Sequence, residues 1–491
     1  MVGSLAKKIN YENENIQIID APKEDLNWTT VSLSEVLDNG KRLEASVFDI
    51  ESKHIRKVLA NGRYPLTQLD GTNGLIKDSF YPGRFKRIYC EPGKGVEFYL
   101  PSQMTDIYPE PTKWISKLTK VSIEDLSLKP NTLLLTRSGT IGNVTIVSKT
   151  LEGKIFSDDV IRTTFKNEED LGYVYAYLKT EYGSNILKTN SYGSVITHIE
   201  PEHLKEMLIP NPPKIIKQKI HDLIIQSFAN RDKSNELIDQ ATQLLVDELE
   251  LPPLEELRKE AFSYSTEINS FDIKLSNLDG RLEASYHVPI TQTIEEHIAK
   301  KAELVKLNDA RITKRIILPG RFKRVYVEKG NGKVFLGGKE IGQLDPANKK
   351  YLSLTHHSER IRNELTLKKD MILVTCSGTI GKVSIVPQHW ESWTVNQHVL
   401  RVVSKKPFHG LIYTWLNSEY GKALISRQIY GSVVDEITDK QIGEVSVPIL
   451  KDEQIRNYIT ELIDKANDLR YRAYQQEQEA IAIMNEEVLG L

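Results

Sequence analysis

The sequence predicts an α+β protein in which two repeated domains are joined by two long antiparallel helices that form a coiled-coil rod. Three observations lead to this prediction: an internal repeat along the chain of 491 residues, short β-rich runs mixed with helical stretches in each copy, and a long helical segment after each copy. The copies are offset by 237 to 239 residues, far more than the roughly 20–50 residues of a solenoid repeat. Each copy therefore has room for a core of its own.

Five motifs carry the repeat, in the same order in both copies. They are Arg42-Leu43-Glu44-Ala45-Ser46 with Arg281-Leu282-Glu283-Ala284-Ser285, Gly83-Arg84-Phe85-Lys86-Arg87 with Gly320-Arg321-Phe322-Lys323-Arg324, Ser138-Gly139-Thr140-Ile141-Gly142 with Ser377-Gly378-Thr379-Ile380-Gly381, Glu181-Tyr182-Gly183 with Glu419-Tyr420-Gly421, and Tyr192-Gly193-Ser194 with Tyr430-Gly431-Ser432. Two copies of one domain usually bind two similar targets. The duplication therefore favours recognition over catalysis.

The first part of each copy is mixed in character. β-rich runs occur at residues 132–136 and 371–375, and Gly, Pro and Asn lie around them, as is typical of short strands and turns. Helical stretches are interspersed, for example at residues 171–187 and 410–425. This mixture predicts an α+β domain in each half.

The second part of each copy is helical throughout. Residues 452–488 contain neither Pro nor Gly, and an a/d seam with alternating spacings of four and three runs through Ile455, Ile459, Leu462, Ala466, Leu469, Ala473, Gln476, Ala480 and Ile483. In residues 214–251 the matching positions are apolar at both ends and polar in the middle: Ile220, Ile224, Ser227, Arg231, Ser234, Ile238, Ala241 and Leu245. Pro252 and Pro253 then stop this helix.

A helix of about 37 residues is roughly 55 Å long and cannot bury a one-sided stripe alone. Two such helices in one chain can bury each other, and an antiparallel pair would place the two domains at opposite ends of a rod. The alternative is that each helix packs only on its own domain.

Composition limits the class of protein only broadly. Hydrophobic residues make up 40% and charged residues 27%, the net charge is −2, and the two cysteines do not align across the repeat. The sequence shows no signal-type apolar run at its start and no apolar stretch of membrane-spanning length, so we expect a cytoplasmic protein without a membrane partner. Residues 300–324 hold nine Lys or Arg and two acidic residues, which suits a local phosphate-binding patch or a solvated charged face.

The order of these motifs resembles the specificity (S) subunit of type I restriction–modification systems. The resemblance rests on the Gly-Thr-Ile-Gly turn after a strand, the Asn396-Gln397-His398 segment, the Gly-Ser turn, a segment ending in Pro210 or Pro448, and helix starts at Gln218-Lys219-Ile220 and Gln454-Ile455. It covers residues 28–491. The first copy departs from it, because Ser157-Asp158-Asp159 stands where the second copy has Asn-Gln-His, and Arg137 stands where the second copy has Cys376.

The resemblance implies a division of the chain. It comprises an N-terminal extension at 1–27, target recognition domain 1 at 28–213, a central long helix at 214–251, a linker at 252–274, target recognition domain 2 at 275–450, and a C-terminal long helix at 451–491.

The resemblance also implies a function without catalysis. Such a subunit binds duplex DNA, and each recognition domain reads one half of a bipartite, asymmetric site while the rod sets the spacer. It holds two methyltransferase subunits and, through them, restriction subunits. No cofactor is expected in this chain; S-adenosylmethionine belongs to the methyltransferase, and ATP and Mg²⁺ belong to the restriction partner.

Three alternatives stay open at this point. One is a tandem DNA- or RNA-binding adaptor outside restriction–modification, and another is a specificity subunit of a related methylation-based defence system. The third is an enzyme, a nuclease or methylase, with a degenerate site. No catalytic or metal site is predicted. The segment Asn211-Pro212-Pro213-Lys214 resembles an amino-methyltransferase motif but lacks its aromatic residue.

Residues shared by the two copies are predicted to contact phosphate, because a shared task is more compatible with positioning than with base reading. They are Arg84, Lys86, Arg87, Ser138, Thr140, Tyr192 and Ser194 in the first copy and Arg321, Lys323, Arg324, Ser377, Thr379, Tyr430 and Ser432 in the second. The alternatives are arginines that pair with local carboxylates and glycines that merely permit a tight turn.

Positions where the copies differ are predicted to read bases. They are Arg137, Asp158 and Asp159 in the first copy and Gln397 and His398 in the second. Gln can pair with adenine through two hydrogen bonds, and Asp can accept one from cytosine N4. The alternative is drift of surface residues.

Overall fold

The computed structural model describes residues 30–38, 43, 45–189, 191, 197–262, 270–431 and 434–491. These fall into two compact units, residues 1–61 and 62–491. In the first unit lie α1 (Leu33–Asp38), η1 (Ala45–Phe48) and α2 (Ile50–Ala60). The Asp49 carboxylate caps α2 by accepting a hydrogen bond from the Ser52 amide (3.0 Å), and Lys53 of α2 pairs with Glu35 of α1 (2.8 Å).

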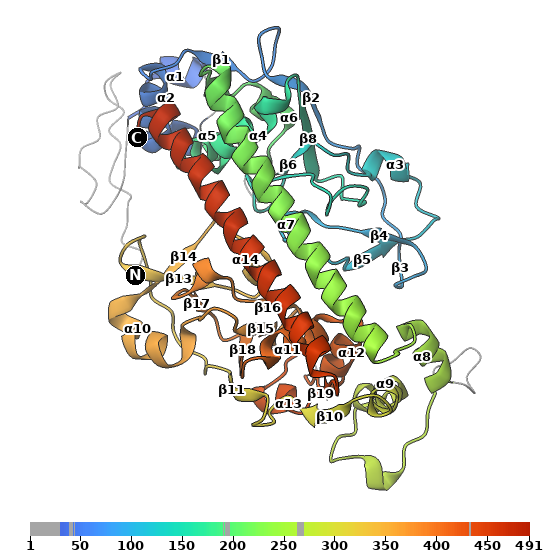
Figure 1. Ribbon diagram of the computed structural model, residues 1–491. Coiled ribbons are helices and arrows are strands. Elements are labelled where there is room, and N and C mark those ends of the chain that lie inside the picture. Colours follow the sequence, from blue (N-terminus) through green and yellow to red (C-terminus); the bar gives the residue numbers. More distant parts are fainter. Residues whose placement is uncertain are drawn as a thin grey trace, which may run out of the picture. The chain divides into compact units, whose positions relative to one another are not determined.

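The second unit is organised on two long helices, α7 (Lys214–Glu248) and α14 (Glu453–Ile483), which lie side by side in Figure 1. Their contacts run in opposite directions: Lys219 near the start of α7 pairs with Glu487, beyond the end of α14, whereas Ser234 meets Arg470. The predicted antiparallel pair is therefore confirmed. Each long helix also packs on the lobe that precedes it in the chain. Packing on the helix's own domain, which was the alternative, therefore occurs in addition to the helix pair.

The ends of the two helices differ slightly from the prediction. α7 ends at Glu248, a little before the two prolines, and Glu250 adopts a positive φ of 48°. α14 ends at Ile483, and the chain continues as a π-helical turn, η8 (Met484–Leu489).

The predicted seam is apolar at its ends and polar at its centre. All the predicted α7 positions are buried except Arg231, which is half-buried. On α14 the predicted positions Ile455, Leu469 and Gln476 are half-buried, and the neighbouring Arg470 and Glu477 are buried more deeply. Gln476 still meets α7, since its Oε1 accepts from Asn230 Nδ2 (2.8 Å). The predicted positions buried on α14 are Ile459, Leu462, Ala466, Ala473, Ala480 and Ile483.

Polar contacts fill the centre of the helix pair. Glu477, 2% exposed, forms ion pairs with Arg231 of α7 and with Lys179 (3.0 Å), which belongs to the first lobe. Burial would raise the pKa of Glu477, but the two neighbouring cations outweigh this effect and lower its pKa to about 2. Nearby, Arg470 donates through Nε to Ser234 Oγ (2.9 Å) and Ser227 Oγ donates to the Ala473 carbonyl (2.7 Å).

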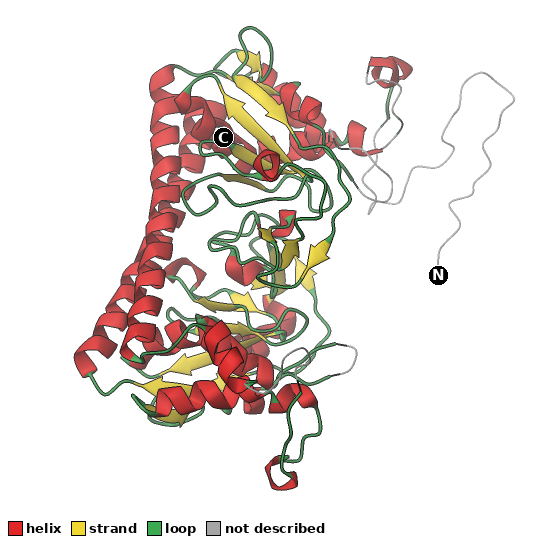
Figure 2. Cartoon of the chain, turned by 90° about the vertical axis from the view of Figure 1, so that its right-hand side faces the viewer, coloured by secondary structure: helices red, strands yellow, loops and turns green. Residues whose placement is uncertain are grey.

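Two α+β lobes, the first at residues 62–213 and the second at residues 275–450, lie against this helix pair (Figure 2). In the first lobe a four-stranded antiparallel sheet has the order β2-β8-β6-β7, a three-stranded sheet has the order β3-β5-β4, and β1 pairs with β9. Their bounds are β1 (Leu66–Gln68), β2 (Ile76–Phe80), β3 (Tyr89–Cys90), β4 (Val96–Phe98), β5 (Lys113–Ile115), β6 (Leu133–Thr136), β7 (Val144–Ile146), β8 (Val160–Phe165) and β9 (Leu208–Pro210). The helices are η2 (Pro101–Gln103), α3 (Ile123–Leu126), α4 (Glu168–Lys179), α5 (Glu181–Thr189) and α6 (Pro201–Lys205).

The second lobe repeats this topology. Its sheets have the orders β11-β18-β15-β16 and β12-β14-β13-β17, and β10 pairs with β19. The strands are β10 (Glu303–Lys306), β11 (Thr313–Ile317), β12 (Tyr326–Val327), β13 (Gly332–Leu336), β14 (Lys350–Ser353), β15 (Ile372–Thr375), β16 (Val383–Ile385), β17 (Thr394–Val395), β18 (Val399–Ser404) and β19 (Ser446–Ile449). The helices are η3 (Leu275–Asn277), η4 (Ala284–His287), α9 (Pro289–Ala299), η5 (Glu340–Gly342), α10 (Leu354–Arg360), η6 (Ile361–Leu365), η7 (Gln388–Trp390), α11 (Phe408–Asn417), α12 (Glu419–Arg427) and α13 (Asp439–Gly443), preceded by α8 (Leu254–Ala261). Even the register shift between Ile76 and Asp78 returns between Thr313 and Arg315, so the predicted α+β repeat is confirmed.

Each predicted helix at 171–187 and 410–425 is in fact two helices, broken at Thr180 and Ser418. Ser418 Oγ donates to the Trp415 carbonyl (2.6 Å) and accepts from the Gly421 amide (3.1 Å), and Thr180 makes the equivalent bonds to Tyr177 and Gly183. A hydroxyl that caps the next helix in this way competes with the continuing helix.

A glycine marks the point where each lobe crosses its long helix. A Cβ atom at Gly172 of α4 would lie 2.7 Å from Cα of His221 on α7, and one at Gly410 of α11 would lie 2.5 Å from Cα of Thr460 on α14. Both crossings are near the starts of antiparallel helices. The two lobes therefore lie toward opposite ends of the helix pair. No helix in the described parts of the chain is long and apolar enough to cross a membrane.

We expect Gly172→Ala to lower the free energy of unfolding by about 1–3 kcal/mol, because the new methyl group must displace helix backbone. The midpoint of urea unfolding measures this effect. The control is Gly83→Ala, at a glycine with open space around it, which should stay within about 0.5 kcal/mol of the parent. Equal shifts for both variants would contradict the close crossing.

We expect Glu477→Ala to cost about 3–5 kcal/mol, since Arg231 and Lys179 would remain buried without their counter-charge. Urea unfolding of the full chain is again the measurement. Glu479→Ala removes an exposed carboxylate from the same helix and should change stability by less than about 0.5 kcal/mol. If the two variants unfolded alike, the buried ion pairs would not stabilise the helix pair.

Candidate functional site

Two equivalent basic loops follow β2 and β11. Each is anchored by a phenylalanine: Phe85 packs edge-on against Phe98 and Phe322 against Phe335, both with ring centroids 6.3 Å apart. The last arginine of each loop lies over the same ring, with its guanidinium carbon 5.6 Å from the ring centre. The remaining cations are exposed: Arg84 and Lys86 in the first lobe, Arg321 and Lys323 in the second. Each lobe therefore presents two cations to solvent from a fixed loop.

The last arginine of each loop also contacts the segment in which the two copies differ. Arg87 forms an ion pair with Asp158 and donates to Ser157 Oγ (3.1 Å), and Arg324 donates to Gln397 Oε1 (2.9 Å). Burial lowers the pKa of Arg87, but the hydrogen bond and charge of Asp158 outweigh this and raise it. The predicted phosphate loop and the predicted base-reading segment are thus directly connected in both lobes.

The Gly-Thr-Ile-Gly turns require their glycines. Their φ angles are positive, at 73° and 83° for Gly139 and Gly142 and at 77° and 84° for Gly378 and Gly381, so the turn-forming role of these residues is confirmed. Thr140 and Thr379 are exposed beside them, and Ser138 and Ser377 are half-buried. Both serines form equivalent antiparallel β-bridges, Ser138 with His198 and Ser377 with Glu436. Ser138 Oγ also donates to Asp159.

Arg137 has a set of partners within its own lobe. It is 5% exposed, pairs with Asp159 (3.3 Å) and Glu200 (2.5 Å), and lies 4.3 Å from the ring centre of Tyr81. In this structure it orients Asp159 and does not face solvent. At the equivalent position Cys376 is 3% exposed, and burial raises its pKa to about 12.

The second lobe gathers the other predicted residues. Gln397 and His398 are half-buried neighbours, with Gln397 Nε2 3.1 Å from His398 Nε2. Burial, together with the charges of Arg324 and Arg321, lowers the pKa of His398. Arg321 pairs at the surface with Glu436 (3.0 Å), which also lies near the Tyr430 hydroxyl (3.4 Å). Tyr192, Ser194 and Ser432 lie outside the described residues.

A pair of buried arginines behind these segments was not predicted. Arg401 donates to the carbonyls of Val395, Asn396 and Val399, and its equivalent Arg162 donates to those of Asp125, Leu126 and Phe156. Burial lowers the pKa of Arg401 to about 9 and that of Arg162 to about 10. They hold the backbone around the divergent segments. The signal in the sequence was an arginine at the same place in two apolar strands.

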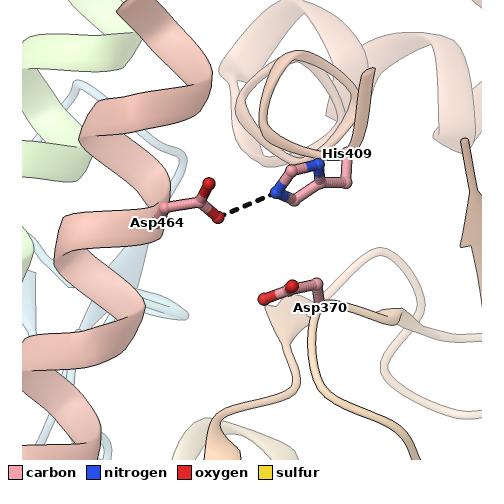
Figure 3. A group of neighbouring side chains, drawn as sticks. All are labelled: Asp370, His409 and Asp464. Atoms are coloured by element: carbon pink, nitrogen blue, oxygen red, sulfur yellow. Dashed lines mark hydrogen bonds and ion pairs between the residues drawn. The ribbon is translucent and has the colours of Figure 1, made fainter. Parts of the chain in front are cut away.

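Asp370, His409 and Asp464 form a separate group, shown in Figure 3, with metal-ligand-type atoms within 4.8 Å of one another. His409 Nε2 and Asp464 Oδ1 are 2.8 Å apart in a hydrogen bond. Asp370 pairs with Lys406 (3.1 Å) and accepts from Asn467 Nδ2 (3.2 Å). Protein groups therefore already occupy these carboxylates, and the contacts attach the second lobe to α14.

Two equivalent α+β lobes on one antiparallel helix pair, each with exposed cations beside a divergent segment, define a two-lobed scaffold for binding. A sequence model of the family described as the type I restriction modification DNA specificity domain matches residues 26–243 and 327–476. No curated protein matches the chain.

Solved structures of the same kind are similar over most of the chain. The S subunit of a type I restriction–modification system from M. genitalium is 16% identical with a TM-score of 0.30, over 88% of this chain and 96% of that chain. The HsdS subunit from Thermoanaerobacter tengcongensis is 12% identical with a TM-score of 0.26, over 86% and 99%. A structure described by the assembly and conformational transition of a type I system is 13% identical with a TM-score of 0.26, over 87% and 97%.

The chain belongs to the type I restriction–modification DNA specificity family, and it is the DNA specificity subunit of such a system. Subunits of this family are non-catalytic. The family assembles with methyltransferase and restriction subunits on DNA.

Proposed function

We propose that this subunit binds a bipartite, asymmetric duplex DNA site and carries two methyltransferase subunits, through which restriction subunits join. Residues 28–213 and 275–450 are the two recognition domains, and each reads one half-site. The segments 214–251 and 451–491 hold them apart. The subunit works in the cytoplasm, and S-adenosylmethionine is bound by the methyltransferase partners, as ATP and Mg²⁺ are by the restriction partner.

One observation supports this proposal above the others: a repeated basic loop touches a divergent segment in the same way in both lobes. Arg87 reaches Asp158 where Arg324 reaches Gln397. A cationic loop shared by both lobes suits the phosphate backbone, which is the same at every DNA site. An adjoining segment that differs between the lobes suits the reading of different bases. Two unlike half-sites follow from two unlike segments.

The roles proposed for the individual residues follow from their exposure. The exposed cations Arg84, Lys86, Arg321 and Lys323 contact phosphates, together with the hydroxyls of Thr140 and Thr379. The half-buried Asp159, Gln397 and His398 face the bases. Asp158 is 6% exposed and paired with Arg87, so it adjoins the reading surface without facing solvent in the free protein. Arg137 acts by positioning Asp159 (3.3 Å), and Arg87 and Arg324 position Asp158 and Gln397.

Exchange of residues 28–213 for the corresponding domain of another family member tests the division of labour. We expect one half of the methylated motif to change and the other half to stay, because the second lobe keeps its loop and segment. Mapping of methylated bases in a genome that expresses the hybrid with its partner methyltransferase reads this out directly. A motif changed in both halves would show that the lobes do not read separately.

We expect Arg84→Ala and Arg321→Ala each to weaken duplex binding and to reduce the slope of log K against log salt by about 1, the effect of one lost phosphate contact. The measurement is a salt titration of the assembled complex on its own site. Arg258→Ala, at an exposed arginine of α8, is the control and should leave the slope unchanged. A slope that Arg84→Ala and Arg321→Ala leave intact would exclude these residues from the phosphate contacts.

A further inference from the structure

The two lobes contact each other through the same segment of the repeat. Asp106 of the first lobe and Gln343 of the second form an antiparallel β-bridge, and the Ile107 amide donates to the Gly342 carbonyl (2.8 Å). Asp106 and Gln343 are equivalent positions, since their offset of 237 is that of the basic loops. When equivalent residues of two copies meet, the contact lies on the two-fold axis that relates the copies.

Both segments are held firmly in their own lobes. Gln103 Oε1 accepts from the Leu100 amide and Glu340 Oε2 accepts from the Gly337 amide, both at 2.8 Å. The residues that follow, Met104 and Ile341, are fully buried anchors. The β-bridge therefore joins two fixed parts of the protein, so that any movement of one lobe against the other must break it.

Ion pairs strengthen the contact on one side of the axis. Lys382 of the second lobe pairs with Asp106 (2.9 Å), whose side chain is 9% exposed, and Lys422 pairs with Glu110 (2.5 Å). A Cβ atom at Gly342 would clash with the Lys382 ammonium and lie 2.9 Å from Asp106 Oδ1, so the glycine leaves room for this pair. Asp106 is the buried member of its pair, and a buried carboxylate with a single cationic partner favours the one arrangement that keeps this partner in place.

On the other side of the axis the equivalent residues are uncharged, and among the described residues they form no ion pair between the lobes. The repeat places Asn143 at the position equivalent to Lys382 and Ser184 at that of Lys422. It places Gln343 at the position equivalent to Asp106 and Ala347 at that of Glu110. These four residues line a cavity of about 760 Å³ between the lobes and the helix pair. The lobes are thus joined by ion pairs on one side. On the other side they flank a hollow that is bridged by a long hydrogen bond from Lys188 Nζ to Asn348 Oδ1 (3.5 Å).

We propose that this one-sided contact, here called the clasp (Asp106, Glu110, Lys382 and Lys422), sets the separation and rotation of the two recognition lobes together with the helix pair, and so determines which DNA spacer lengths are accepted. The inference rests on the proposed function. One added base pair moves the half-sites by about 3.4 Å and rotates them by about 35°. Lobes joined to the helices alone could follow such a change in part, whereas lobes joined by the clasp resist it.

A reversible lock tests the spacer role. Paired residues in an antiparallel bridge have Cα atoms about 4.5–5.5 Å apart, which suits a disulfide. Asp106→Cys with Gln343→Cys, in a Cys90→Ser chain that also carries Glu110→Gln, therefore gives one protein whose lobes are locked by a disulfide when oxidised and lack both ion pairs of the clasp when reduced. The chain is assembled with its methyltransferase partner and offered sites whose spacer is one base pair shorter, unchanged or one longer.

The oxidised complex should keep the spacer preference of the parent. In the reduced complex the ratio of methylation at the best spacer to methylation at the altered spacers should fall roughly three- to tenfold. Gln343→Cys alone is the matched control and should not respond to reductant. Equal preference in the oxidised and reduced complexes would overturn the spacer role.

A distance measurement tests the clasp without DNA. Spin labels on the exposed positions Lys120→Cys and Arg362→Cys, one on each lobe, report the lobe–lobe distance in the full chain. Lys382→Met should broaden the distance distribution, whereas Lys368→Met, at an exposed lysine of the same lobe, should not. Unchanged distances in Lys382→Met would overturn the clasp itself. A parent complex that methylates no bipartite motif would overturn the proposed function and the spacer role with it, and the distances would still decide on the clasp.

Discussion

The buried ion cluster at the centre of the helix pair is the constraint on which the arrangement of the second unit depends. Glu477 of α14 meets Arg231 of α7 and Lys179 of α4, so that one carboxylate ties both long helices and the first lobe. An apolar seam tolerates a slip by one heptad, since apolar residues would still meet apolar residues. Charged groups buried at a single level do not, because a slip would leave each of them without its partner. The ion cluster therefore fixes the register of the two helices, whereas the apolar residues at both ends of the seam provide most of the hydrophobic stabilisation.

Repetition governs the rest of the fold, down to single contacts. The crossings at Gly172 and Gly410, the caps at Thr180 and Ser418, and the buried Arg162 and Arg401 each occur twice. These duplicated features all concern the internal framework of a lobe or its attachment to a long helix. The unlike residues gather where the basic loops meet Asp158 or Gln397 and at the contact between the lobes. The contacts that build each lobe are thus shared by the two copies, whereas the segments beside the basic loops and at the lobe contact differ between them.

Local pattern was sufficient to predict much of this structure. The spacing of four and three marked the long helices, the apolar runs marked β6 and β15, and the repeated Gly-Thr-Ile-Gly marked turns that do need positive φ. The break at Thr180 was missed, because a hydroxyl in mid-helix is also compatible with a continuous helix. The burial of Glu477 beside the predicted seam was not foreseen, because its partners Arg231 and Lys179 lie on α7 and α4, which are remote in sequence. The exposed cations of the candidate site followed from the motifs, but the burial of Arg137 did not, since its partners Asp159 and Glu200 come from other segments.

The uncharged residues opposite the clasp have a consequence for how such a molecule could arise. In a symmetric dimer of half-length chains, any residue placed at the axis would be present twice, and a lysine on one side would bring a lysine on the other. Fusion of the halves into a single polypeptide removes that restriction, because Asn143 and Lys382 are encoded separately. An asymmetric junction, with ion pairs on one flank and a hollow on the other, is therefore open to the fused chain and closed to a symmetric dimer of identical halves.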